Sequence, residues 1–198
     1  MLQQEFEQMK AAYFQIFRQF YPAKRSNGFV ERNLTVNFAR AYEQCHKEEN
    51  CFTWYELSFG NKKRMDGCIV NVTRKEIFLI ESKRFNNPEK KKEEVKADIC
   101  RIDAFDVAAE FSQRLPDWQD YTVYGVILAD VWCEVDSKTT IFREFAEGTY
   151  ESDLRDRGLC HYIAEFTELK SSADKWTAGE PGNTNRENYK ILGFSWQR

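Results

Sequence analysis

Residues 53–85 constrain the fold more than any other part of the sequence, because they contain three short runs typical of β-strands. The runs are Thr53–Phe59, Arg64–Val70 and Glu76–Phe85. Turn residues separate them, first Gly60 and Asn61 and then residues 71–75. The sequence therefore predicts three consecutive strands, joined by short turns, at the centre of the fold.

The third strand combines an apolar face with two charged side chains. Because side chains alternate between the faces of a strand, Glu81 and Lys83 share a face with the apolar residues two and four positions before Glu81. In the preceding strand, Asp66 comes directly before Gly67, whose missing side chain allows a close approach. If the two strands pair as a hairpin, Asp66 and Glu81 converge at one end with Lys83 beside them.

Such a cluster suits metal-assisted hydrolysis of a phosphodiester. Two carboxylates can hold Mg²⁺ and leave most of its octahedral shell to water and a phosphate oxygen. The metal lowers the pKa of a bound water, and a nearby lysine orients that water or neutralises developing charge. The sequence therefore predicts Asp66 and Glu81 as ligands of Mg²⁺, which Mn²⁺ can replace, and Lys83 as a catalytic residue.

The spacing of these residues resembles the PD-(D/E)XK nuclease superfamily, which includes restriction endonucleases, Holliday-junction resolvases and phage-type exonucleases. A gap of 14 residues separates Asp66 from Glu81, Ser82 and Lys83 at the end of an apolar strand, and Met65 stands where the family pattern has proline. The resemblance covers residues 27–132. It implies a restriction endonuclease-like fold, cleavage of DNA, and a metal shell completed by the backbone carbonyl of Ser82, whose side chain points away.

A second helix is predicted to begin after residues 26–28 and to run to about Cys45. Its apolar stripe consists of Val30, Leu34, Phe38, Ala41, Tyr42 and Cys45. Glu31 borders this stripe, where an ionised carboxylate is costly without a partner. The resemblance implies that Glu31 approaches the metal and joins the catalytic residues. The alternative is a first-turn glutamate that only favours the helix dipole.

Basic side chains flank the predicted site on both sides in the sequence. They are Lys62, Lys63, Arg64, Arg84, Lys90, Lys91, Lys92, Lys96 and Arg101. Glu93 and Glu94 interrupt the run, and a charge run is most often a solvated helix face. Because these residues flank the acids on both sides in the sequence, we predict that they contact nucleic-acid phosphates.

The first 20 residues predict an amphipathic helix that Pro22 ends. Its apolar residues recur at spacings of three and four: Leu2, Phe6, Met9, Tyr13, Ile16 and Phe20. This face either packs across the core of its own domain or forms the seam of a dimer. A dimer would suit an enzyme that cuts both strands of a duplex.

The remaining elements predict a mixed α/β architecture. A helix starts at residues 86–88 and is predicted to run to Leu115. The nearly continuous apolar run Tyr121–Trp132 is typical of a strand covered on both faces and joined in parallel to the preceding strand. The order α-α-β-β-β-α-β predicts a mixed β-sheet flanked by helices.

We expect one domain with three parts: an N-terminal helix over 1–22, a catalytic core over 27–132 and a C-terminal extension over 133–198. The extension predicts a short helix over 139–147 and a strand over 161–166. A long surface loop over 170–188 and a closing strand over 189–196 complete it.

Composition limits the function classes. The net charge of −3 gives no overall basic signal, so phosphate contacts must come from local patches. Six cysteines without Cys-x-x-Cys spacing, and no apolar run long enough to span a membrane, predict free thiols in the cytoplasm. Only two histidines accompany them, which argues against a zinc site.

These observations together predict a cytoplasmic, Mg²⁺-dependent DNA endonuclease with Asp66, Glu81, Lys83 and Glu31 as its catalytic residues. Two alternatives remain open. One is an inactive nuclease-fold module that binds or assembles, as a homodimer or within a larger protein assembly. The other is a metal-dependent phosphoesterase acting on RNA or nucleotides.

Overall fold

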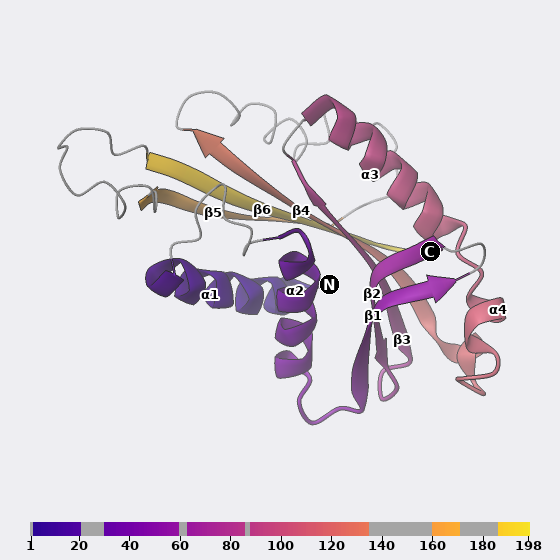
Figure 1. Ribbon diagram of the computed structural model, residues 1–198. Helices are drawn as coiled ribbons and strands as arrows, with labels where there is room; N and C mark the ends of the chain where they lie inside the picture. Colours follow the sequence, from indigo (N-terminus) through magenta and orange to yellow (C-terminus); the bar gives the residue numbers. More distant parts are fainter. Residues whose placement is uncertain (1, 21–29, 60–62, 86–87, 135–159, 171–185) are drawn as a thin grey trace.

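A six-stranded twisted sheet lies between two layers of helices (Figure 1). The computed structural model describes residues 2–20, 30–59, 63–85, 88–134, 160–170 and 186–198. The helices α1 (Gln3–Phe20) and α2 (Arg32–Cys45) cover one face of the sheet. The helices α3 (Pro88–Asp103) and α4 (Val107–Phe111) cover the other. The mixed α/β architecture predicted from the sequence is confirmed.

The strand order places the C-terminal strand inside the sheet. The strands are β1 (Cys51–Phe59), β2 (Lys63–Asn71), β3 (Glu76–Arg84), β4 (Thr122–Glu134), β5 (Cys160–Lys170) and β6 (Arg186–Gln197). Their order in space is β1-β2-β3-β4-β6-β5. The strands β3 and β4 are parallel, as predicted, and the other neighbouring strands are antiparallel. The six predicted strands are therefore confirmed, with bounds that differ from the predicted ones by one to a few residues.

The apolar run of β4 is explained by a separate hydrophobic core on each face of the sheet. Val126 and Leu128 point into the core beneath α1 and α2. Ile127 and Ala129, which alternate with them, point into the core beneath α3 and α4. Because both faces of β4 are buried, the strand needs apolar side chains at almost every position.

The apolar face of α1 packs against its own chain. Phe6 stacks on Tyr162 of β5, Tyr13 stacks on Tyr189 of β6, and Phe17 lies against Phe166 of β5. The buried members of this face are Leu2, Phe6, Met9, Tyr13 and Phe17. The interpretation as a helix packed on its own core is therefore confirmed, and the sheet covers the face that a dimer seam would have used.

Two predicted helices differ from the structure. The helix α2 begins at Arg32, after the predicted capping residues, and Val30 is 47% exposed outside its buried stripe. The helix predicted to continue to Leu115 is interrupted after α3. Phe105 turns into the core there, against Phe59 and Phe111. Asp106 then starts α4 by accepting a hydrogen bond from the amide of Ala109. Burial of Phe105 and this new cap override the continuous helical pattern.

Parts of the C-terminal extension lie outside the described residues. These are the helix predicted over 139–147 and most of the loop predicted over 170–188, of which 171–185 are not described. Four cysteines of the described part, Cys45, Cys51, Cys68 and Cys100, are free thiols. Among the described helices, none is both long enough and apolar enough to cross a membrane.

Candidate functional site

The candidate site lies where β2 separates from β3. The β2–β3 ladder runs from Asn71 opposite Glu76 to Gly67 opposite Ile80, whereas β3 continues to Arg84. Beyond Ile80, amides of β3 that have no partner in β2 donate hydrogen bonds to carboxylates instead. Asp66 Oδ2 accepts a hydrogen bond from the amide of Ser82 at 2.8 Å, and another carboxylate binds the next amide of the same edge.

That second carboxylate belongs to Glu31, the residue before α2. Its Oε2 accepts a hydrogen bond from the amide of Arg84 at 2.9 Å, and its Oε1 lies 3.9 Å from Lys83 Nζ. Glu31 is helical in conformation but makes no side-chain cap to its own helix. The end of β3 thus holds two acids, which come from β2 and from the start of α2.

Glu81 and Lys83 point from β3 towards α3, on the same face, as the strand alternation predicts. Glu81 Oε1 lies 2.7 Å from Arg101 Nη2, and Lys83 Nζ lies 3.0 Å from Asp98 Oδ2. Asp98 and Arg101 also pair with each other across one turn of α3. The structure therefore brings together the four predicted catalytic residues and adds two side chains from α3.

Sequence reasoning missed Asp98 as a site residue, although one signal was available. Asp98 directly precedes Ile99 and lies three residues after Val95, so it borders the buried stripe of α3. The same argument singled out Glu31 on the earlier helix. Applied to α3, it would have selected Asp98, which is only 3% exposed. Arg101 was counted only as part of a basic run.

The electrostatics of the site are dominated by buried acid. Among the described side chains, those that form ion pairs with the four carboxyl groups of Glu31, Asp66, Glu81 and Asp98 are two cations, Lys83 and Arg101. Burial, together with the charges of Asp66 and Asp98, raises the pKa of Glu81 to about 8 against the opposing effect of Arg101. Burial also raises the pKa values of Glu31 and Asp98.

Lys83 remains the charged partner in this cluster. Burial alone would lower the pKa of its ammonium group, but the carboxylates of Asp98, Glu31 and Glu81 outweigh burial and raise it. Asp98 Oδ2 forms an ion pair with Lys83 but receives no well-aligned hydrogen bond. The ammonium group is therefore held as a cation beside the carboxylates.

The donor set fits a divalent cation in its chemistry and charge. When all four carboxyl groups are ionised, they exceed the two cations by two charges, and their oxygens are the hard ligands that Mg²⁺ takes. Among the described residues, no three His, Cys, Asp or Glu side chains form a metal-binding group. In this arrangement Arg101 instead occupies an oxygen of Glu81. Asp66 and Glu81 would hold the metal, with the Ser82 carbonyl as a further predicted ligand.

Two neighbouring residues serve the packing of α2 on the sheet. The Ser82 hydroxyl lies 2.6 Å from the Thr35 hydroxyl of α2, so this side chain points away from Glu81 and Lys83, as expected. A Cβ atom on Gly67 would lie 2.6 Å from Thr35 Cγ2. The missing side chain of Gly67 therefore makes room for α2.

Arg84 was predicted to contact phosphate, but its side chain is bound within the protein. Its guanidinium turns into the core and binds both carboxylate oxygens of Asp130, at 3.1 and 2.6 Å. Asp130 is fully buried and also accepts a hydrogen bond from the Tyr189 hydroxyl. Because strand alternation turns Arg84 away from the face of Glu81 and Lys83, its charge holds the core together instead of facing a ligand.

The other basic residues predicted to contact phosphate either form ion pairs with glutamates or have side chains that the structure does not describe. Lys91 pairs with Glu94 at 2.6 Å and Lys96 pairs with Glu93 at 3.0 Å. Of these two, Lys91 is near enough to act on the charge of Glu31. The side chains of Lys62, Lys63, Lys90 and Lys92 lie outside the described part.

Glu56, a secondary carboxylate of the first strand, lies outside the acidic cluster. It pairs with Arg32 at 2.6 Å and with Arg64 at 3.5 Å. Its backbone has a positive φ of 54°, and it is the one position between Cys51 and Phe59 with no partner in the β1–β2 ladder, whose register is otherwise constant. Arg64, which was predicted to contact phosphate, is thus engaged by this glutamate.

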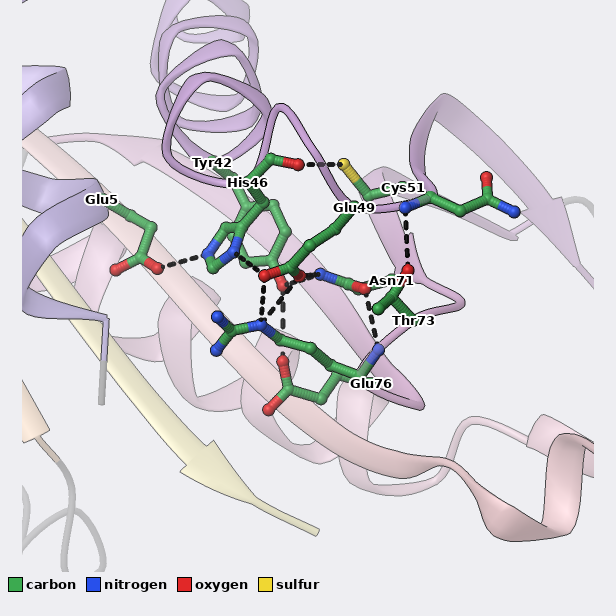
Figure 2. A network of polar contacts seen from close by, with 10 residues as sticks. Glu5, Tyr42, His46, Glu49, Cys51, Asn71, Thr73 and Glu76 are labelled. Carbon is green, nitrogen blue, oxygen red and sulfur yellow. Dashed lines mark hydrogen bonds and ion pairs between the residues drawn. The ribbon is translucent and has the colours of Figure 1, made fainter.

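A second polar network lies at the opposite end of β3 (Figure 2). His46, which is 6% exposed, bonds Glu5 at 2.8 Å and faces Glu49 at 3.2 Å. Glu49 also binds Arg74 and Asn71, and the hydrogen bond from Arg74 is the main cause that lowers the pKa of Glu49 to about 2. These contacts tie α1 and the end of α2 to the β2–β3 turn, which is a structural role.

Neutralising Glu81 should stabilise the metal-free protein. In the folded protein the Glu81 pKa is raised to about 8 from its usual 4.5, so the folded state holds a proton that the unfolded state releases between these values. Stability therefore falls as the pH rises through this window. We expect Glu81→Gln to raise the free energy of unfolding at pH 8 by about 1–3 kcal/mol, and by little at pH 4.5. Thermal melts in EDTA at both pH values measure this, and a destabilised variant at pH 8 would contradict it.

Comparisons with known proteins add no family assignment. No protein-family model matches the chain, and neither the curated proteins nor the solved structures give a match.

Proposed function

We propose that this protein is a metal-dependent nuclease that hydrolyses phosphodiester bonds of DNA through a metal-activated water. The observation that carries the proposal is the convergence of Asp66, Glu81, Lys83 and Glu31 at the end of β3. These residues come from β2, β3 and the start of α2. An acidic cluster with one protonated lysine in its midst is the arrangement that metal-assisted phosphodiester cleavage needs.

Each residue has a specific role in the proposed mechanism. Asp66 and Glu81 would hold Mg²⁺, and Glu31 would add a further oxygen directly or through a water. A bound metal would lower the pKa of a water and stabilise charge on the phosphate. Lys83 would donate a hydrogen bond to the attacking water or to the developing negative charge. Asp98 keeps the ammonium group of Lys83 in place by an ion pair of 3.0 Å.

The order of elements supports a restriction endonuclease-like core. Two helices precede an antiparallel meander, and α3 then connects β3 to the parallel strand β4. Apart from α4 and a short 3₁₀ helix before β4, this is the order α-α-β-β-β-α-β predicted from the sequence, and it agrees with the α/β core that the resemblance to PD-(D/E)XK nucleases implies. The free thiols of the described part fit the cytoplasmic location inferred from the sequence.

The test combines metal binding with cleavage. Calorimetry should show that the purified protein binds Mg²⁺ or Mn²⁺, and labelled single- and double-stranded DNA should be cut in their presence and left intact in EDTA. Asp66→Asn retains an oxygen that can accept the Ser82 amide hydrogen bond, so the fold should survive while metal binding and cleavage are lost. A wild-type protein that binds no divalent cation and cuts neither DNA nor RNA would refute the proposal.

A non-catalytic module with this fold is the second candidate. The observation in its favour is that Lys83 and Arg101 already bind Asp98 and Glu81, so these carboxylates are neutralised without a metal. It predicts no heat of divalent-cation binding and, for an assembly role, a stable homodimer or larger complex on sizing. Cleavage of RNA or nucleotides alone would instead identify a phosphoesterase with the same chemistry.

A further inference from the structure

We propose that Arg101 is an internal counter-ion that occupies an oxygen of Glu81 in the metal-free protein and transfers to the scissile phosphate when the metal binds. This inference rests on the proposed nuclease function and assigns to Arg101 a direct contact with the scissile phosphate. It makes Arg101 the group that couples loading of the metal to capture of the substrate.

Arg101 contacts an oxygen of Glu81, one of the predicted metal ligands. Its Nε and Nη2 lie 3.1 and 2.7 Å from Glu81 Oε1, and Nη2 also binds Asp98. Both carboxylates are almost completely buried, with exposed fractions of 2% and 3%. One guanidinium therefore bridges two buried acids, of which Glu81 is a predicted metal ligand.

Arg101 is also the cation that has room to move. Its side chain is 27% exposed, compared with 15% for Lys83, and it extends from α3 on a long flexible stem. Lys83 lies on the same strand as Glu81 and is held from two sides, by Asp98 and Glu31. The two cations therefore have different roles in the proposal: Lys83 remains beside the attacking water, and Arg101 can dissociate from Glu81.

Charge balance gives the reason for the transfer. A divalent cation on Glu81 would repel a guanidinium bonded to the same oxygen, because like charges in a poorly solvated site interact strongly. The substrate would bring a negatively charged phosphate to this site. A guanidinium matches a phosphate with two parallel hydrogen bonds, which an ammonium cannot do. When Arg101 is released from the Glu81 carboxylate, it can therefore bind the phosphate, which is also negatively charged.

The proposal predicts opposite effects on metal binding and on catalysis. Arg101→Ala removes a competing cation, so we expect calorimetry with Mn²⁺ to show binding about tenfold tighter than in the wild type. The same variant should cut DNA about 100-fold more slowly at saturating metal, because the phosphate loses its donor. Arg101→Lys keeps the charge, so its metal affinity should stay near that of the wild type. Arg114→Ala, an exposed arginine of the segment after α4, is the matched control and should change neither quantity.

The outcomes separate this inference from the proposed function. A merely structural Arg101 would weaken metal binding and cleavage together in Arg101→Ala, and that result overturns the inference while leaving the nuclease intact. Tighter metal binding with unchanged cleavage overturns the transfer to phosphate. A wild-type protein that neither binds Mn²⁺ nor cuts DNA refutes the proposed function itself. If Arg101→Ala does not fold, as judged by circular dichroism, Arg101→Gln takes its place with the same expected results.

Discussion

Replacing Lys83 with methionine should reduce Mg²⁺-dependent DNA cleavage at least about a thousandfold, because the only cation held beside both Asp98 and Glu31 in the described site is lost. Methionine keeps much of the apolar stem of lysine, and Arg101 remains to pair with Asp98. The fold should therefore persist. Single-turnover cleavage at saturating metal and with enzyme in saturating excess over DNA measures the chemical step without contributions from substrate binding.

The control for this experiment is Lys75→Met. Lys75 lies at the start of β3, at the end opposite the candidate site, and its ammonium group pairs with Asp117 at 3.0 Å on the surface. Its removal should leave cleavage within about twofold of the wild type, since exposed ion pairs contribute little. Lys83→Met should still bind Mn²⁺, because Asp66 and Glu81 are intact. Cleavage by Lys83→Met at the wild-type rate would exclude Lys83 from the chemistry.

The largest loss of stability is expected from Asp130→Ala. Asp130 is completely buried and accepts hydrogen bonds from the Arg84 guanidinium and the Tyr189 hydroxyl. Its removal leaves a partly buried guanidinium without its carboxylate, which typically costs about 3–5 kcal/mol. For a chain of this length, the melting temperature should fall by about 10 °C. Thermal or urea denaturation measures the change.

Two further variants test the cause of this loss. Asp120→Ala removes an exposed acid, whose only described ion pair is a 4.0 Å contact with Lys75, and should change stability by less than about 0.5 kcal/mol. The double variant Arg84→Met with Asp130→Leu replaces the ion pair by apolar groups and should recover much of the lost stability. If the double variant is as unstable as Asp130→Ala, the packing of Asp130, and not its charge, would explain the loss.

Arg84 links the two regions that these variants change, the buried ion pair of Asp130 and the candidate site. Its side chain binds Asp130 in the core, and its amide binds Glu31 of the candidate site. Asp130→Ala should therefore loosen the end of β3 and lower cleavage indirectly. Lys83→Met acts on the chemistry while the core stays intact, so melts recorded beside the cleavage assays distinguish the two effects.

Local pattern in the sequence determined the faces of the strands and the identity of the central residues. The alternation in β3 was enough to put Glu81 and Lys83 on one face, because a period of two is a property of the extended backbone itself. The apolar run of β4 was likewise enough to predict a strand covered on both faces. The nuclease function that these residues suggest remains a prediction.

Tertiary structure alone decided which distant side chains meet at the end of β3. Asp98 and Arg101 joined the site because α3 packs its buried stripe over that strand, and Arg84 left the predicted phosphate surface because a buried acid on β4 faces it. The insertion of β6 between β4 and β5 is of the same kind. Each depends on a partner tens of residues away or more, and periodicity within one element carries no information about such a partner.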